Sequence, residues 1–357
     1  MYGRILLNDT YEVKDMSIYD DIEKIKKQIE EENSEPLKIA LFGQPGAGKS
    51  SIINKLVGER VAKTGASTDV TTEADFIPYE GLLLVDLPGY GTSKFPPNEW
   101  MSQFNPKEFD LFLCVFSGKF HEADTRFFKE LQESGKVCLF VRNMSDQLWE
   151  DGKTLEELKQ DIIDDVEKQV GSRQNVYFTS CRTSTGFDSL QDAIQESLEP
   201  AKKEKYIRYA KAYTVEHLEQ KREECKKLVT KYAAIAAANG INPVPGVDIS
   251  VDLSVMLKLF SQINKAYGLN DAKLALLEGA LLPVAKKVLD YATKEGLSLL
   301  LKRFATKTAL KNSSKYVPIV GQVIAASAGY AMTYKAGIHY LDDCHELATE
   351  VLKKELQ

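Results

Sequence analysis

One short segment of the chain combines glycines, a lysine and a serine at a spacing that suits phosphate. It reads Gly43-Gln44-Pro45-Gly46-Ala47-Gly48-Lys49-Ser50, and it lies between an apolar run at 37–42 and a helical pattern at 52–57. Glycines let backbone N–H groups turn inward around a phosphate, and a helix starting at the loop adds its dipole. A lysine supplies positive charge, and a serine hydroxyl suits Mg²⁺. We therefore expect nucleotide contacts from Gly43, Gly46, Ala47, Gly48, Lys49 and Ser50, with Lys49 also acting on the transferred phosphate.

A second motif begins where the apolar run 82–85 ends. Asp86 follows that run, and Pro88-Gly89 comes directly after Leu87. A carboxylate at a strand end can hold Mg²⁺ through a water, and the Gly89 N–H can meet the γ-phosphate. We therefore predict that Asp86 helps to hold the metal. We also predict that Gly89 contacts the γ-phosphate, so that the loop after it responds to hydrolysis.

The segment 64–79 between the two motifs is rich in Thr, Asp and Ser and lacks apolar periodicity. A nucleotide-sensing loop belongs at this place. Thr71 and Thr72 are the candidates for a second hydroxyl on Mg²⁺, and Thr72 is preferred because the second of paired threonines is the ligand in many GTPases. The alternative, an ordinary surface threonine, stays open.

The choice of base depends on the residues after the run 137–141, which read Arg142-Asn143-Met144-Ser145-Asp146. In guanine-specific proteins this place reads Asn or Thr, Lys, any residue, Asp. The carboxylate accepts from guanine N1 and N2, and adenine has no such pair of donors. Asn143 and Asp146 fit the spacing, whereas Met144 replaces the lysine whose stem lies along the base. Guanine is therefore favoured over the alternative, adenine. Two further contacts, from backbone N–H groups after the run 176–178, are expected at Ser180 and Cys181.

The sequence lacks the residue that usually orients the attacking water in such enzymes. Tyr90 occupies the place after DxxG where Ras-like enzymes have a water-orienting glutamine, and Pro45 stiffens the phosphate loop. Water must then be positioned by Asp69 or Glu73, by a group supplied in trans, or by a facing protomer. We therefore expect slow basal turnover that rises with self-association. The alternative is a nucleotide-gated binding or scaffold module with negligible hydrolysis.

Hydrophobic patterning predicts the strands and helices on which these residues lie. Short apolar runs alternate with polar helical stretches from 37 to about 198, which is typical of a buried parallel sheet in an α/β domain. Residues 16–33 show an isoleucine stripe at helical spacing, and the chain after Pro200 shows helical patterns without convincing strands. We expect an N-terminal helical segment at 1–36, a nucleotide domain at 37–199 and a helical domain at 200–357.

Composition narrows the class of partner. The net charge is 46 − 52 = −6, which argues against a general nucleic-acid binder. The five cysteines are scattered, so reduced thiols in a cytoplasmic protein are expected. The segments 232–247 and 317–334 lack charged residues but are rich in small ones, which favours buried helices over a membrane span. Peripheral contact with an anionic membrane stays open as the alternative, because 202–231 and 286–315 are locally basic.

The assembled motifs resemble those of the immunity-related GTPases. The matching segments are Gly43–Ser51, the motif from Val85 to Gly91, and Asn242-Pro243-Val244-Pro245-Gly246-Val247-Asp248. The resemblance implies GTP/GDP and Mg²⁺ as ligands, Ser51 in the nucleotide site, and a homodimer formed through G domains. It also implies a Ras-like P-loop G domain with a mixed, mostly parallel sheet, joined to an all-α domain built from N- and C-terminal segments. Family members associate with intracellular membranes, and vertebrate ones act in defence against vacuolar pathogens. This sequence departs from the family at Met144, which replaces the lysine of the base motif, and in the missing myristoylation start. A divergent branch, such as bacterial relatives, is left open by these two departures.

Overall fold

The computed structural model describes residues 23–30, 35–64, 74–88, 104–239, 252–270, 274, 281–304 and 328–355. The chain divides into two compact units, Glu35–Tyr213 and Met1–Ser34 with Thr214–Gln357. Helix α7 (Pro200–Tyr209) lies in the first unit, although the sequence analysis assigned residues from 200 onward to the helical domain. The reason is packing, since Tyr206 and Tyr209 are buried in the core beside the sheet.

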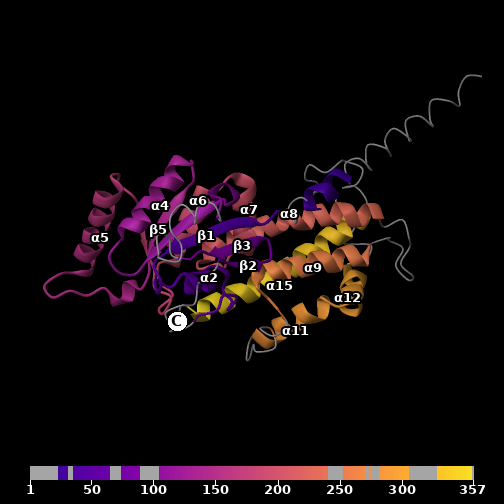
Figure 1. The fold of residues 1–357 in the computed structure, drawn as a ribbon. Coiled ribbons are helices and arrows are strands. Elements are labelled where there is room, and N and C mark those ends of the chain that lie inside the picture. Colours follow the sequence, from indigo (N-terminus) through magenta and orange to yellow (C-terminus); the bar gives the residue numbers. More distant parts are fainter. Residues whose placement is uncertain are drawn as a thin grey trace, which may run out of the picture. The chain divides into compact units, whose positions relative to one another are not determined.

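The first unit is built on one six-stranded sheet (Figure 1). The strand order is β2-β3-β1-β4-β5-β6, and only β2 runs antiparallel to its neighbour. A mixed, mostly parallel sheet is therefore confirmed. The strands are β1 (Leu37–Gly43), β2 (Asp75–Tyr79), β3 (Leu82–Asp86), β4 (Leu111–Phe116), β5 (Cys138–Arg142) and β6 (Val176–Phe178).

Helices cover both faces of this sheet, because successive strand side chains point to opposite sides. In β1, Ile39 and Leu41 belong to the core with α2 (Lys49–Val57), α6 (Phe187–Ser197) and α7. Ala40 and Phe42 belong to the second core, with α4 (Glu122–Glu133) and α5 (Leu155–Val170). Burial on both faces explains why the central strands read as continuous apolar runs.

The carboxyl ends of the parallel strands lie together at one edge of the sheet. The registers pair Leu41 with Asp86, Gly43 with Val115, and Phe116 with Arg142. Ligands of open α/β sheets bind outside this edge. The motifs predicted to bind phosphate, metal and base all follow these strand ends.

The second unit is helical. Its described helices are α8 (Val215–Asn239), α9 (Leu253–Tyr267), α11 (Leu282–Tyr291), α12 (Lys294–Phe304) and α15 (Ala328–Glu355). They share one core, in which the rings of Phe260 and Tyr340 stack with centroids 3.8 Å apart. Ile29, from the segment before the sheet, packs against the same core. The predicted helical domain built from N- and C-terminal segments is thereby confirmed.

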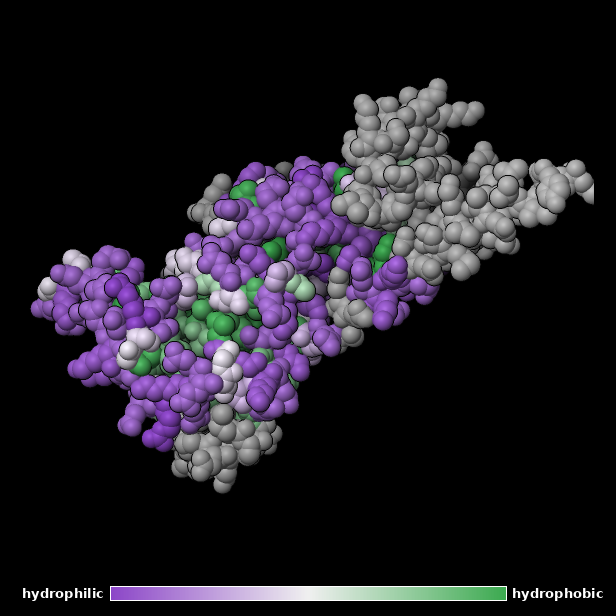
Figure 2. All heavy atoms as spheres, turned by 90° about the horizontal axis from the view of Figure 1, so that it is seen from above, coloured by the Kyte–Doolittle hydropathy of each residue, from purple (hydrophilic) through white to green (hydrophobic). Residues whose placement is uncertain are grey.

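No helix in the described part of the chain is both long enough and apolar enough to cross a bilayer. In the apolar segments singled out from the sequence, Tyr232, Tyr330 and Met332 are buried. The described side chains on the face drawn in Figure 2 are mostly hydrophilic, with one larger group of hydrophobic side chains near the middle and smaller ones elsewhere.

Candidate nucleotide site

The loop between β1 and α2 has a backbone that glycine must supply. Gly43, Gly46 and Gly48 have φ values of 131°, 80° and 87°. A Cβ on Gly43 would lie 1.9 Å from the Val115 carbonyl oxygen, and one on Gly48 would lie 2.3 Å from Asn143 Nδ2. Any larger residue at these two positions would force neighbouring atoms apart. Ala47 is buried under the loop, Pro45 is exposed, and Ser51 is half-buried on α2.

Three predicted residues converge where the loop enters α2. Ser50 Oγ donates to Asp86 Oδ2 at 2.5 Å, and Lys49 Nζ lies 3.7 Å from Asp86 Oδ1. Lys49 Nζ also donates to the Gly43 carbonyl at 3.3 Å. The Lys49 side chain is 6% exposed and that of Asp86 is 4% exposed. Two segments far apart in sequence are thus joined by a buried ion pair and a hydroxyl.

Burial disfavours the charged form of each partner in this ion pair. It lowers the pKa of Lys49 and raises the pKa of Asp86, while their mutual attraction opposes both shifts. A buried charge of this kind needs further compensation. For Lys49, an anionic phosphate would supply that compensation.

The same cluster fits a Mg²⁺ ion. Asp86 Oδ1 is buried and makes no hydrogen bond to any described residue. Mg²⁺ prefers oxygen ligands and keeps several waters, so one hydroxyl and one carboxylate are the donors expected from protein. Ser50 and Asp86 therefore have the chemistry to hold Mg²⁺ beside a phosphate.

The phosphate loop is also tied to α4 by a contact that sequence reasoning missed. Gln44 Nε2 donates to Asp124 Oδ2 at 3.1 Å and to the Lys119 carbonyl at 3.0 Å. Asp124 is buried, and burial raises the pKa of its carboxyl. The link fixes the outer turn of the phosphate loop. No sequence signal pointed to it, because residue 124 lies eighty positions away.

Asn143 fastens the base loop to the phosphate loop. Its side chain is 1% exposed, and Nδ2 donates to the Ala47 carbonyl at 2.9 Å. Its Oδ1 accepts from Thr179 Oγ1 at 3.4 Å and from Cys181 Sγ at 3.6 Å. Asn143 therefore joins three loops. Burial raises the pKa of the Cys181 thiol to about 11, so this side chain is neutral.

Asp146 is held by the loop that follows β6. Arg182 Nε donates to Asp146 Oδ2 at 2.7 Å. The Ser180 side chain and the Arg182 guanidinium together hold the pKa of Asp146 below its ordinary value. Sequence reasoning named Ser180 and Cys181 but missed Arg182, although it is the next residue in the same motif.

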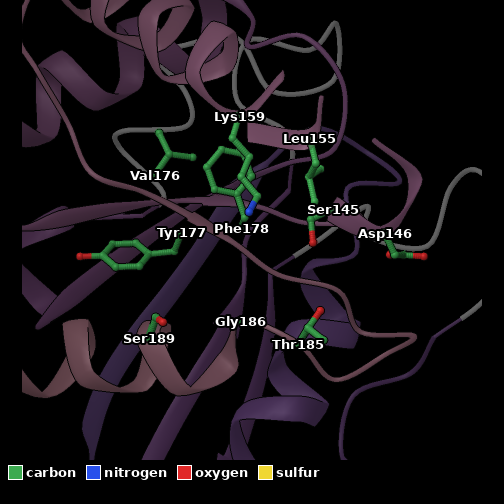
Figure 3. Close-up of a pocket in the computed structure, with 10 residues that line it drawn as sticks. All are labelled: Ser145, Asp146, Leu155, Lys159, Val176, Tyr177, Phe178, Thr185, Gly186 and Ser189. Atoms are coloured by element: carbon green, nitrogen blue, oxygen red, sulfur yellow. The ribbon is translucent and has the colours of Figure 1, made fainter. Parts of the chain in front are cut away.

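A pocket of about 530 Å³ lies beside the base loop. Figure 3 shows Asp146, Ser145 and Thr185 on one side of it, and Lys159 above the ring of Phe178. The Lys159 ammonium lies 5.8 Å from the centroid of that ring. The lining residues come from the base loop, α5, β6, the loop before α6 and α6 itself, and none comes from the phosphate loop. The pocket therefore adjoins the predicted site at its base end.

Several predicted residues lie outside the part of the chain that the structure describes. They include the sensing-loop threonines, the glycine after the second motif and the residues weighed as water-positioning groups. They are Asp69, Thr71, Thr72, Glu73, Gly89 and Tyr90.

Comparisons with known proteins cover nearly the whole chain. A family model described as interferon-inducible GTPase (IIGP) matches residues 5–355. The mouse interferon-gamma-inducible GTPase 10 is 24% identical over 342 residues, covering 90% of this chain and 82% of the relative. The mouse T-cell-specific guanine nucleotide triphosphate-binding protein 2 is 25% identical, covering 94% and 85%. Among solved structures, Era from Aquifex aeolicus is 17% identical with a TM-score of 0.36, covering 56% and 67%.

These matches agree with the resemblance drawn from the phosphate loop, the second motif and the helical tail. The fold adds a mostly parallel sheet with a glycine-dependent loop at its carboxyl edge. The chain therefore belongs to the interferon-inducible GTPase family.

Proposed function

We propose that this chain is a switch that binds GTP or GDP with Mg²⁺ at the carboxyl edge of the sheet and hydrolyses GTP slowly until a second copy associates through its G domain. Family membership and relatives that are named GTPases support GTP hydrolysis in general. The observation that carries the proposal is the buried cluster of Lys49, Ser50 and Asp86. Two buried charges and an unsatisfied carboxylate oxygen are arranged for a phosphate and its metal.

In this proposal each side of the cluster has a defined task. Lys49 places positive charge on the β- and γ-phosphates, where charge develops during transfer. Ser50 and Asp86 hold Mg²⁺, which neutralises phosphate charge when it is bound. The glycine loop orients the chain of phosphates through its backbone N–H groups.

At the other end of the nucleotide, Asp146 selects the base. Its carboxylate accepts from the N1 and N2 donors of guanine, and Asn143 keeps the base loop at a fixed distance from the phosphate loop. Backbone N–H groups at Ser180 and Cys181 complete the base site. Thr72 and Gly89 remain proposed as metal and γ-phosphate residues.

The test measures the rate of GTP hydrolysis per protein molecule as a function of protein concentration. In parallel, the molecular mass in solution is measured with GDP and with a non-hydrolysable GTP analogue. The proposal predicts turnover that rises with concentration and a larger species only with the analogue. Lys49→Met serves as the inactive control. Flat turnover per molecule would remove the role of self-association.

A nucleotide-gated module without catalysis is the alternative, favoured by Tyr90 at the place of the usual glutamine. Tight GTP binding without phosphate release at any concentration would establish it. Peripheral contact with an anionic membrane is proposed as a further property of the GTP-bound state. Flotation of the full chain with vesicles, with and without the GTP analogue, tests that property.

A further inference from the structure

The base loop lacks the cation that its motif normally carries. Met144 stands in that position, with its backbone in the left-handed region at φ 56°. A Cβ on Gly48 would lie 3.9 Å from the Met144 methyl carbon, so the side chain reaches toward the phosphate loop. A thioether is apolar and carries no proton to donate. Met144 can therefore contact the nucleotide, but it cannot supply a positive charge.

A cation from a different loop lies at the same end of the site. The Arg182 side chain is 74% exposed, and its Nε nevertheless lies 2.7 Å from the Asp146 carboxylate, which is only 10% exposed. The cation of this ion pair is exposed to solvent, so the pair is expected to contribute little to folding stability. Its consequence is therefore expected in the orientation and charge of Asp146 and not in the stability of the fold.

The carboxylate retains capacity for a ligand while Arg182 is bound. An ionised carboxylate has about four lone-pair sites. Arg182 Nε uses one of them on Oδ2, and the Ser180 side chain also donates to this carboxylate. The remaining sites can accept from N1 and N2 of guanine. The contact thus positions the acceptor without closing it.

We propose that Arg182 is a specificity-determining positioning residue, which replaces from the loop after β6 the cation that Met144 lacks and holds Asp146 oriented for guanine. This inference rests on the proposed function, because it concerns the base end of the same site. It predicts that Met144 and Arg182 are energetically coupled through Asp146, although they belong to different loops.

A double-mutant cycle tests the coupling. The dissociation constants of GDP, IDP and ADP are measured for the wild type, Arg182→Ala, Met144→Lys and the double variant. Arg182→Ala is expected to weaken GDP binding about tenfold, the effect of one charge-assisted hydrogen bond, and ADP binding less than about twofold. With Met144→Lys present, the loss of Arg182 is expected to cost less than about threefold, because the restored lysine compensates.

Two control variants separate this role from a structural one. Arg182→Lys keeps the charge and is expected to recover part of the guanine preference. Arg173→Ala removes an exposed arginine that precedes β6, and it is expected to leave all three constants unchanged. Thermal unfolding of every variant verifies that the fold is intact.

Each outcome has a defined meaning. Equal losses from Arg182→Ala in both backgrounds would overturn the coupling, and an unchanged GDP constant would overturn the role of Arg182. Equal weakening of GDP and ADP would also overturn it, because the effect would not involve the base. A wild type that binds no guanine nucleotide would instead overturn the proposed function itself.

Discussion

The phosphate end and the base end of the site are built in different ways. At the phosphate end, Lys49 and Asp86 are almost fully buried and share one ion pair. At the base end, the Asp146 carboxylate is paired with Arg182, whose side chain is largely exposed. Asn143 connects the two ends through the Ala47 carbonyl.

The difference in burial leads us to expect that residue types are more tightly constrained at the phosphate end than at the base end. A buried charge without its partner costs several kcal/mol, so the residue types at the phosphate end are narrowly constrained. An exposed charge is solvated, so another loop can provide it. At the base end, Met144 stands where the motif has lysine, and Arg182 from another loop lies nearby. We expect such a replacement to be tolerated at the base end but not at the phosphate end.

The largest expected effect is at the phosphate end. Lys49→Met removes the positive charge that we propose acts on the β- and γ-phosphates, and each lost bond to a charged group is worth about 1.5–3 kcal/mol. GTP affinity measured by calorimetry should fall roughly 100-fold or more. Lys55→Met, on the same helix but bonded to Ser184, is the matched control and should bind normally. If both variants bind GTP equally well, the phosphate end has been assigned to the wrong lysine.

A smaller but more selective effect is expected at the base end. Asp146→Asn replaces an acceptor by a group that can also donate, which suits the C2 carbonyl of xanthine. Guanine affinity should fall roughly 10- to 100-fold, the effect of one hydrogen bond to a charged group, and xanthine affinity should rise. Competition between GDP and XDP measures the exchange. Unaltered guanine binding would show that Asp146 does not read the base.

As the pH is lowered, the phosphate end of the site should be affected before the base end. Burial raises the pKa of Asp86, so its carboxylate takes up a proton at a higher pH than an ordinary aspartate. The Ser180 side chain and Arg182 lower the pKa of Asp146, which therefore stays ionised to a lower pH. As pH falls, the Mg²⁺ dependence of GDP binding should disappear before the preference for GDP over ADP. Titrations at several pH values with and without Mg²⁺ measure both, and the reverse order would contradict these assignments.

The smallest effect is expected at Cys181. Its pKa of about 11 leaves almost no thiolate at neutral pH, and the thiolate is the reactive form. Alkylation followed by mass spectrometry should therefore be slow at this residue and should accelerate at alkaline pH. Cys181→Ser keeps a donor to Asn143 and should leave GDP affinity within about twofold, in the range of a modest hydrogen-bond change. Rapid labelling at neutral pH would argue against the buried, neutral thiol.

The sequence predicted the phosphate end because its residues lie in two contiguous motifs at strand ends. Gly43, Lys49, Ser50 and Asp86 meet as the patterning indicated, and the apolar runs predicted the parallel strands. The antiparallel strand β2 (Asp75–Tyr79) was not predicted from patterning, because it lies in the segment 64–79 that was expected to be a loop. The links of Gln44 to Asp124 and of Arg182 to Asp146 were not predicted. Each joins segments brought together only by the sheet, so local spacing carries no signal for it.

Helix α7 illustrates the same limit at the level of domains. Pro200, at its first position, suggested a domain boundary before it. The two tyrosines Tyr206 and Tyr209 instead bury their rings against the sheet core. Tertiary packing decides such an assignment, and the local pattern does not show which core a helix will join.

We propose that a phosphate site built on Lys49, Ser50 and Asp86 is joined to a base site that selects guanine despite Met144. The most direct measurement compares GDP and ADP affinities of the wild type with Mg²⁺ present. GDP should bind at least about tenfold more tightly than ADP, the effect of one hydrogen bond to the Asp146 carboxylate. Equal affinities for GDP and ADP would contradict it.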